Sequence, residues 1–552
     1  MAARVRTRFV STAVCFGVVG ALAVAPGAHA KAKGFEFGVA AGDVSSSSAI
    51  LWAKATKSGD ALAQLTAKGG FGSCDIAGAS KKEIAAAAKS HDNTVQKKVK
   101  DLAADTAYKY RFCMQGGAKS DTGKFTTAPS PKQAKTVSFA ISGDQDARPS
   151  PGQTTPYWNN FEVWDAIRGQ RNDFNVLMGD TIYSDTEIPG YTLADVALTV
   201  KQKWRAYKTN LGLKPWAKAR GSAAYYGSWD DHEFVNDFAR GEDVFPLGVG
   251  DVNIDGEELY ERGVDAYTDY TPVTFKKKTG IYRSVQWGKN LEVFFLDDRS
   301  FRSNTSDYQG ACDNPAGSGN PDLAPTAPQS TRNAFSVIVP QLSNPAPPAC
   351  LASINDPNRT LLGSKQLAKF EQEIESSKAT FKVIFNQVPI QQQYANPYDR
   401  WEGYAAERTE VLRFLQQNVK NVVFLSTDVH GSMVADARFC TLGDGCPQDS
   451  GILDVVTGPI ATATYSDEIN SVLGSPSGGA LIHDAFFKPP PPNGIGLQCA
   501  AIDQYSYAQV EASKSQLTVD LLDANDAPVK DTGERDSAAT ASPCAQVVIP
   551  KQ

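Results

Sequence analysis

The chain has 552 residues, with 55 lysines and arginines against 61 aspartates and glutamates. This length exceeds what one small hydrophobic core holds, so we expect two folded domains. The acidic balance argues against nucleic acid or an anionic membrane as the principal partner, because phosphate backbones are bound by clustered lysine and arginine.

Residues 1–30 have the pattern of an export signal. An arginine-containing start precedes an apolar stretch at residues 9–26, and Ala28-His29-Ala30 is typical of a cleavage site. We predict that the mature chain begins near Lys31 and is secreted or lies in the periplasm or cell envelope. The arginines are not consecutive, which favours the general export route. The alternative is a retained anchor, although about 18 apolar residues are marginal for spanning a bilayer.

Cleavage removes three of the 55 basic residues and Cys15, which leaves 52 basic against 61 acidic residues, a formal charge of −9, and eight cysteines. An even number of cysteines in an exported chain predicts disulfides. The simplest connectivity joins sequence neighbours: Cys74 with Cys113, Cys312 with Cys350, Cys440 with Cys446, and Cys499 with Cys544. A cysteine metal cluster is the alternative, but no Cys-x-x-Cys spacing supports it.

The sequence pattern of residues 33–128 predicts a β-sandwich domain of the immunoglobulin or fibronectin type. Short alternating runs, such as residues 49–54 and 106–112, are separated by Gly, Ser and Asp, as in such sandwiches. Tyr108 has the spacing of a tyrosine corner, and Trp52 is a candidate for the core of the sandwich.

The pattern changes after a polar linker, and residues 136–552 predict one α/β domain. We predict strands at residues 137–141, 175–178, 291–296, 381–385 and 421–425. They alternate with predicted helices at residues 158–168, 200–209, 364–377 and 407–418. This alternation favours a largely parallel sheet with its site at the carboxyl ends of the strands. The Pro-, Asn-, Ser- and Gly-rich stretch around residues 310–350 predicts a long surface insertion.

Four short acidic clusters follow one another along this domain. They are Gly143-Asp144-Gln145-Asp146, Gly179-Asp180-Thr181-Ile182-Tyr183, Asp230-Asp231-His232-Glu233 and Asp428-Val429-His430. The first, second and fourth each follow an apolar run that predicts a buried strand. Carboxylates at the ends of parallel strands converge on one crevice, where they coexist only if cations neutralise them. The sequence therefore predicts a polynuclear metal site.

From about residue 35 to the C-terminus, the chain resembles the alkaline phosphatase D (PhoD-like) family of metallophosphoesterases. The likeness rests on the opening phrase at residues 37–43 and on ordered segments at residues 179–183, 229–233, 296–299 and 428–430. The resemblance implies a metallophosphoesterase-type layered sheet domain, α/β in class, after the sandwich. It also implies a hydrolase that cleaves phosphate mono- and diesters by attack of a metal-bound hydroxide. We expect the chain to be a monomer.

Two alternatives to this activity stay open. The first is a phospholipase D-type phosphodiesterase that acts on head groups at a phospholipid surface, with Phe486, Phe487 and the prolines of residues 489–492 as lipid contacts. The second is a binding or cell-surface protein whose second domain is a degenerate enzyme. The intact acidic clusters argue against the degenerate enzyme. In the resembling family a C-terminal element can cover the metals, and residues 498–545 are the candidate for it here.

The resemblance implies two unequal metal sites that share Asp180. Asp144, Tyr183 and His430 would join Asp180 around Fe³⁺, because a phenolate ligand requires a strongly acidic cation. Asp144 stands where many members of the family are expected to have a cysteine, so the identity of this metal is open.

The second metal would take Asp231, Asn386 and Asp428 together with Asp180. This set of oxygen ligands favours Ca²⁺, with Mg²⁺ or Mn²⁺ as alternatives, over Zn²⁺, which prefers imidazole and thiolate. Few histidines are present to support a zinc site, since the whole chain has only five.

His232 is the predicted general acid for the leaving group, oriented by Glu233 or Asp230. Arg299 and Arg148 are candidates for the phosphoryl oxygens, because a guanidinium binds them bidentately. For Arg299 the alternative is an ion pair with an acidic neighbour in its own segment.

Overall fold

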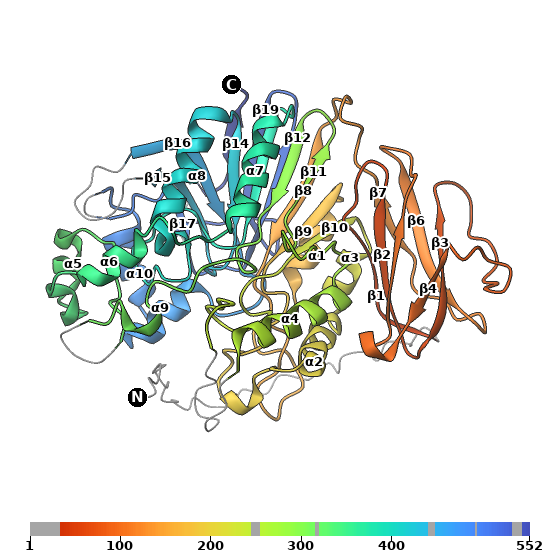
Figure 1. Ribbon diagram of the computed structural model, residues 1–552, viewed down its shortest axis with the longest axis horizontal. Helices are drawn as coiled ribbons and strands as arrows, with labels where there is room; N and C mark the ends of the chain where they lie inside the picture. The colour runs from red at the N-terminus through yellow and green to blue at the C-terminus, as the bar shows by residue number, and fades with distance from the viewer. Residues whose placement is uncertain (1–33, 244–253, 315–319, 440–447, 492–493, 533–543) are drawn as a thin grey trace.

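The computed structural model describes residues 34–243, 254–314, 320–439, 448–491, 494–532 and 544–552. Two large sheets are stacked face to face and carry helices on their outer faces, and a smaller sheet lies at one end (Figure 1). Among the described residues, no helix combines the length and apolar character needed to cross a membrane. The predicted export signal lies outside these residues.

The first large sheet has nine strands in the order β20-β19-β18-β8-β9-β10-β1-β2-β5. The strands are β1 (Phe35–Gly42), β2 (Ala49–Ala55), β5 (Thr94–Val99), β8 (Val137–Ser142), β9 (Phe174–Met178), β10 (Ala224–Ser228), β18 (Ser506–Ala512), β19 (Gln516–Asp523) and β20 (Val547–Pro550). β8, β9 and β10 run parallel, whereas β18 joins β8 in the antiparallel sense. The parallel strands are almost entirely apolar because both of their faces are covered.

The second large sheet has seven strands in the order β11-β12-β13-β14-β16-β15-β17. The strands are β11 (Arg283–Trp287), β12 (Leu291–Phe295), β13 (Phe381–Asn386), β14 (Val422–Ser426), β15 (Ser432–Phe439), β16 (Gln448–Val456) and β17 (Cys499–Ala501). β12, β13, β14 and β16 are parallel. Aromatic rings join the two sheets: the ring centroids of Phe139 and Phe385 lie 5.7 Å apart, and those of Phe174 and Trp287 lie 4.7 Å apart.

Helices complete a four-layer arrangement. The first sheet is covered by α1 (Glu162–Gly169), α2 (Val200–Leu211), α3 (Lys214–Arg220) and α4 (Gly256–Tyr270), which share one buried apolar cluster with it. The second sheet is covered by α7 (Ser364–Ser376) and α8 (Ala405–Asn418) (Figure 1). The other described α-helices are α5 (Gln329–Phe335), α6 (Pro348–Ile354), α9 (Tyr465–Leu473) and α10 (Gly478–Ile482). These four lie at the end of the molecule opposite the N-terminal strands (Figure 1).

The predicted strands of the α/β domain correspond to β8, β9, β12, β13 and β14, and the predicted helices to α1, α2, α7 and α8. The expectation of one largely parallel sheet is wrong, because the parallel strands are divided between two sheets. The described part of residues 498–545 supplies β17 to the second sheet and β18 and β19 to the first, so it extends both sheets.

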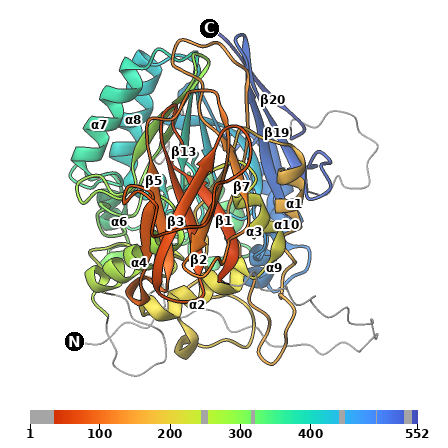
Figure 2. The same ribbon diagram turned by 90° about the vertical axis from the view of Figure 1, so that its right-hand side faces the viewer.

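The N-terminal strands form two layers, which face the viewer in Figure 2. β1, β2 and β5 extend the first large sheet, while a separate sheet contains β4 (Ile84–Ala87), β3 (Gly59–Thr66), β6 (Ala107–Met114) and β7 (Gly123–Thr126) in that order. Side chains of both layers, such as Leu51 and Phe112, belong to one buried cluster. The hydroxyl of Tyr108 accepts the backbone N–H of Ala103 at 3.0 Å, as a tyrosine corner requires.

Trp52 does not lie in the core between these layers, contrary to the prediction. It is fully buried on the other side of β2, where its Nε1 donates to the carbonyl of Asp269 at 2.8 Å. Its ring contacts Tyr270 and the guanidinium of Arg220. Through these contacts, Trp52 packs the N-terminal strands against α3 and α4.

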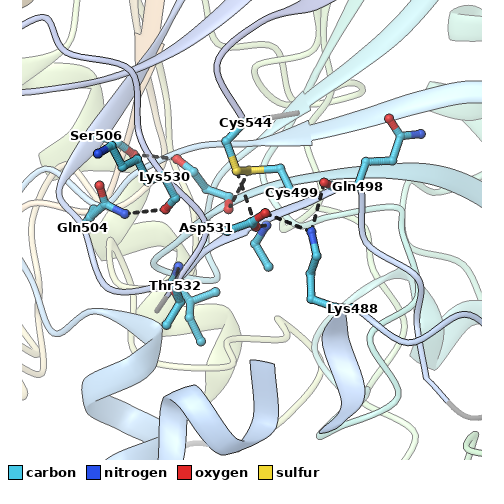
Figure 3. Close-up of a disulfide and its surroundings, with 12 residues drawn as sticks. Lys488, Gln498, Cys499, Gln504, Ser506, Lys530, Asp531, Thr532 and Cys544 are labelled. Atoms are coloured by element: carbon cyan, nitrogen blue, oxygen red, sulfur yellow. Dashed lines mark hydrogen bonds and ion pairs between the residues drawn. A yellow bond between two sulfur atoms is a disulfide. The ribbon is translucent and has the colours of Figure 1, made fainter. Parts of the chain in front are cut away.

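Three of the four predicted disulfides are present: Cys74–Cys113, Cys312–Cys350 and Cys499–Cys544. The predicted pair Cys440–Cys446 lies outside the described residues. Figure 3 shows the Cys499–Cys544 bridge beside Asp531, which accepts the backbone N–H of Ala500 at 2.7 Å. This bridge joins β17 of the second sheet to the segment that leads into β20 of the first.

Replacing both Cys499 and Cys544 by Ala is expected to destabilise the chain by about 2–4 kcal/mol, because the bridge restricts 45 residues of the unfolded chain. Urea unfolding followed by circular dichroism measures the loss as a lower transition midpoint. The double variant avoids a free thiol, and a midpoint equal to that of the wild-type protein would contradict the stabilising role.

Candidate metal centre

The acidic clusters lie just beyond the carboxyl ends of parallel strands. Asp144 follows β8, Asp180 follows β9, Asp231 follows β10 and Asp428 follows β14. The two sheets meet at these ends, because the hydroxyl of Thr427, after β14, donates to the carbonyl of Met178 on β9 at 2.6 Å. Clusters that are far apart in the sequence are thus brought to one edge of the stacked sheets.

The loops that carry the clusters have unusual backbone geometry. Asp144, Asp180, Asp428 and His430 have φ angles of 61°, 46°, 74° and 52°. Non-glycine residues rarely adopt this left-handed region, and such strain persists where the surroundings enforce it. Asn210 provides one such restraint, since its Nδ2 donates to the carbonyls of the residues after Asp144 and Asp180, at 3.0 and 2.8 Å.

Two glycines allow the close approach of these loops. Gly179 has a φ of 78°, and a Cβ added there would lie 2.7 Å from the Cβ of Asp230. Gly458 has a φ of 108°, and its Cβ would lie 2.8 Å from Oδ2 of Asp144. Only glycine fits both the conformation and the space.

The first group contains the residues predicted for the iron side. Asp144, Asp180 and His430 each offer a ligand atom, and these atoms lie within 4.8 Å of one another. The hydroxyl of Tyr183 lies 2.8 Å from Nε2 of His430. Nδ1 of His430 lies 2.6 Å from a carboxylate oxygen of Glu468 on α9, which fixes the orientation of the ring. The structure thus brings the four predicted residues together.

The second group surrounds Asp231. Its ligand atom lies within 4.8 Å of those of Asp180 and His232 and, in another set, of Asp230 and Asp428. Asp180 belongs to both the first and the second group, as a carboxylate shared by two cations must. The His232 ring lies beside Asp231, as expected for the general acid.

Asn386 ends β13 and pairs with Ser426, two residues before Asp428. It is fully buried, and its Oδ1 accepts from Nε1 of Trp401 at 3.1 Å while its Nδ2 donates to the carbonyl of Val388. These two bonds orient the amide, and an amide oxygen keeps a second lone pair for a cation.

Arg299 is fully buried and lies close to carboxylates of the second group. Its Nε donates to Asp230, and its Nη1 and Nη2 donate to the carboxylate of Asp399 at 2.6 and 2.7 Å. Nη2 also lies 3.8 Å from Asp231 and 3.9 Å from Asp428. These contacts argue for the ion-pair alternative and against phosphoryl binding, although its partners come from other segments than expected.

Arg148 is partly buried beyond the end of β8. Its guanidinium lies 5.8 Å from the ring centroid of Tyr191, and it makes no ion pair with any residue that the structure describes. Its charge interacts with the carboxylates of Asp146 and Asp195.

His232 is oriented by Asp185. Its Nδ1 lies 2.7 Å from a carboxylate oxygen of Asp185, and its ring stacks on Tyr183 with centroids 4.0 Å apart. Burial alone would lower the pKa of His232, but the carboxylates of Asp185, Asp231 and Asp180 outweigh it and raise the pKa well above its ordinary value. The imidazole is thus held protonated when no cation is bound.

The expectation that Glu233 or Asp230 orients His232 is wrong. The carboxylate of Glu233 accepts the backbone N–H groups of Thr181 and Asp230, at 2.7 and 2.8 Å, and so binds two of the acidic loops to each other. Asp185, which does orient His232, lies within two residues of the second cluster, so the sequence offered that signal. No sequence signal of this kind pointed to Glu468 or Asp399.

The buried carboxylates fit bound cations. Burial raises the pKa of Asp144 to about 6 and those of Asp180 and Asp428 well above their usual range, and neighbouring carboxylates add to this. Oδ2 of Asp144 and Oδ2 of Asp230 are buried without a hydrogen-bond partner among the described residues. Hard cations would neutralise these groups and occupy the unused oxygens.

Tyr183 requires such a cation if it is to act as a phenolate. Burial raises the pKa of its hydroxyl well above 10, and the carboxylates of Asp180 and Asp144 raise it further. Only a strongly acidic ion in direct contact would remove this proton near neutral pH.

The sequence of the chain is similar to those of known phosphatases. The sequence model of the PhoD-like phosphatase family matches residues 150–521, and that of the N-terminal domain of PhoD-like phosphatases matches residues 21–129. Alkaline phosphatase D of Bacillus subtilis (strain 168) is 24% identical over 457 residues, which make up 76% of this chain and 68% of that protein.

Two solved structures share the fold. PhoD covers 95% of this chain and 91% of its own length, with a TM-score of 0.66 and 18% identity. The purple acid phosphatase PPD1 from yellow lupin (Lupinus luteus) seeds covers 90% of this chain and 74% of its own, with a TM-score of 0.52 and 12% identity. The PhoD-like phosphatase family model matches more than half of this chain, so the chain belongs to that family.

Proposed function

We propose that this chain is an exported, metal-dependent phosphoesterase that hydrolyses phosphate mono- and diesters of small molecules. The observation that carries the proposal is the buried convergence of carboxylates, Tyr183 and His430 at the strand ends of a chain from a phosphatase family. Export would follow cleavage near Ala30. Residues 33–128 would form the β-sandwich domain and residues 136–552 the catalytic domain.

Two cations would complete the centre. Asp144, Asp180, Tyr183 and His430 would hold Fe³⁺. Asp180, Asp231, Asn386 and Asp428 would hold Ca²⁺, with Mg²⁺ or Mn²⁺ as alternatives. Bound there, the cations would lower the pKa of a water and neutralise charge on the phosphoryl group.

The side chains of the protein supply the proton and the position of the substrate. Asp185 holds Nδ1 of His232, so the opposite ring nitrogen, Nε2, is directed away from it and can protonate the leaving alkoxide. Arg148, without an ion-pair partner among the described residues, would bind phosphoryl oxygens at the rim.

No specific observation favours the phospholipase D-type alternative. Phe486 and Phe487, expected as exposed lipid contacts, are only 6% and 1% exposed, so this expectation is wrong. Phe486 instead packs against Phe335 of α5 with ring centroids 5.2 Å apart.

An activity panel tests the proposed function directly. Purified protein supplied with iron and calcium should hydrolyse 4-nitrophenyl phosphate and bis(4-nitrophenyl) phosphate, and EDTA should remove both activities by stripping the metals. Release of choline from phosphatidylcholine vesicles, in preference to both aryl esters, would instead support the phospholipase activity. Inactivity on all three substrates would support a degenerate enzyme.

Tyr183→Phe tests the composition of the metal centre. Elemental analysis of the wild-type protein should find iron together with a second divalent metal, and an iron-tyrosinate should give a visible absorption band. Tyr183→Phe should lose this band while the second metal remains. A fully active, iron-free protein would contradict the assignment.

His232→Ala tests the general acid. Loss of a positioned acid is expected to lower turnover roughly 10²–10⁴-fold for an alkyl phosphate, whose alkoxide needs a proton, and much less for 4-nitrophenyl phosphate. Asp185→Asn, which weakens the orientation of the ring, should show the same selectivity at smaller size. Equal losses on the alkyl and aryl substrates would refute the role.

A further inference from the structure

Arg400 lies in the loop between β13 and α8, next to the residue that anchors Arg299. Asp399 receives hydrogen bonds from Arg299 and from Nη1 of Arg302, the latter at 2.8 Å. The carbonyl of Arg400 accepts the N–H of Gly403 at 2.9 Å. The backbone of Arg400 is therefore held in place beside the carboxylates of the second group.

The guanidinium of Arg400 is only partly used by the protein. Its Nη2 donates to the carbonyl of Ala395 and lies 3.6 Å from a carboxylate oxygen of Glu402. Its Nε is buried without an acceptor among the described residues. Glu402 is already held by the backbone N–H groups of Gln393 and Tyr394, at 2.6 and 2.9 Å, so it does not fully satisfy the arginine.

The charge of Arg400 acts on residues of the metal centre. It interacts electrostatically with Asp428 and with Tyr465, whose backbone N–H donates to the carbonyl of His430 at 2.9 Å. The side chain of Asp428 is 16% exposed, whereas that of Asp231 is 5% and that of Arg299 is 0% exposed. The side chain of Arg400 is 10% exposed.

We propose that Arg400 binds the non-bridging oxygens of the substrate phosphoryl group from the Asp428 side and favours dianionic monoesters over monoanionic diesters. The inference rests on the proposed phosphoesterase function. A buried guanidinium with an unused N–H forms strong charge-assisted hydrogen bonds to such oxygens. Arg148, which follows β8 of the first sheet, would contact the same group from the other side. A dianion offers more charge to Arg400 than a diester does, which gives the preference its physical basis.

The test compares Arg400→Gln with the wild-type protein on 4-nitrophenyl phosphate and bis(4-nitrophenyl) phosphate, with inorganic phosphate as inhibitor. Loss of one charge-assisted contact predicts a drop of roughly 10- to 100-fold in kcat/KM for the monoester, with a several-fold smaller loss for the diester. The inhibition constant of phosphate should rise by about tenfold or more on the same grounds.

Arg408→Gln is the matched control, because Arg408 is a buried arginine near Glu402 that donates to the carbonyl of Ile390. It should affect both esters alike and leave phosphate inhibition unchanged. If Arg400→Gln does not fold, Arg400→Lys replaces it as the test variant. This variant keeps the positive charge but loses the second N–H donor, so phosphate should still inhibit it more weakly than the wild-type protein.

Equal losses on both esters with unchanged phosphate inhibition would overturn the role of Arg400 and leave the phosphoesterase function intact. A wild-type protein that hydrolyses neither ester with metals supplied would overturn both proposals. The two failures are therefore distinguishable from the wild-type measurement alone.

Discussion

The structure depends on keeping several carboxylates together, out of water, at one edge of two stacked sheets. Burial raises the pKa of Asp144, Asp180 and Asp428, and neighbouring carboxylates raise it further, because their charges are unfavourable without compensation. Within the described residues, Arg299 is the one fully buried cation in contact with the second group. One guanidinium, together with the protonated imidazole of His232 that lies among these carboxylates, cannot neutralise all of them. The fold therefore presupposes further positive charge, which metal ions would supply.

The same constraint explains the strained loops. Four of the predicted ligand residues have left-handed backbone conformations, and loops of this kind relax unless their backbones are tied to one another. The ties come from polar side chains outside the predicted ligand set: Asn210 connects the loops after β8 and β9, and Glu233 connects those after β9 and β10. The rigidity of the site is thus distributed over buried hydrogen bonds behind the ligands.

The sequence was informative where local pattern and location coincide. A continuous apolar run followed by Gly-Asp predicts a buried parallel strand with a carboxylate at its end, and β8 and β9 follow this rule, while β14 is followed by Thr427 and Asp428. The partners that orient the site were not predictable, because Glu468 and Asp399 approach from segments with no pattern of their own. The division into two sheets was also hidden, since parallel strands in either sheet carry the same apolar signature. Trp52 was misplaced for a related reason: burial of a tryptophan does not reveal which face of its strand is buried.

Each sheet supplies only part of the centre. Asp144, Asp180 and Asp231 follow strands of the first sheet, whereas Asn386, Asp428 and His430 come from the second, as do the arginines beside Asp428. Neither set of the proposed ligands would bind two cations without the other, so the proposed site requires that the aromatic interface between the sheets is packed. The C-terminal segment crosses from β17 in the second sheet to β18 in the first, and the Cys499–Cys544 bridge closes this crossing. The proposed metal centre therefore stays intact only while the two sheets stay packed together, because the same contacts maintain both.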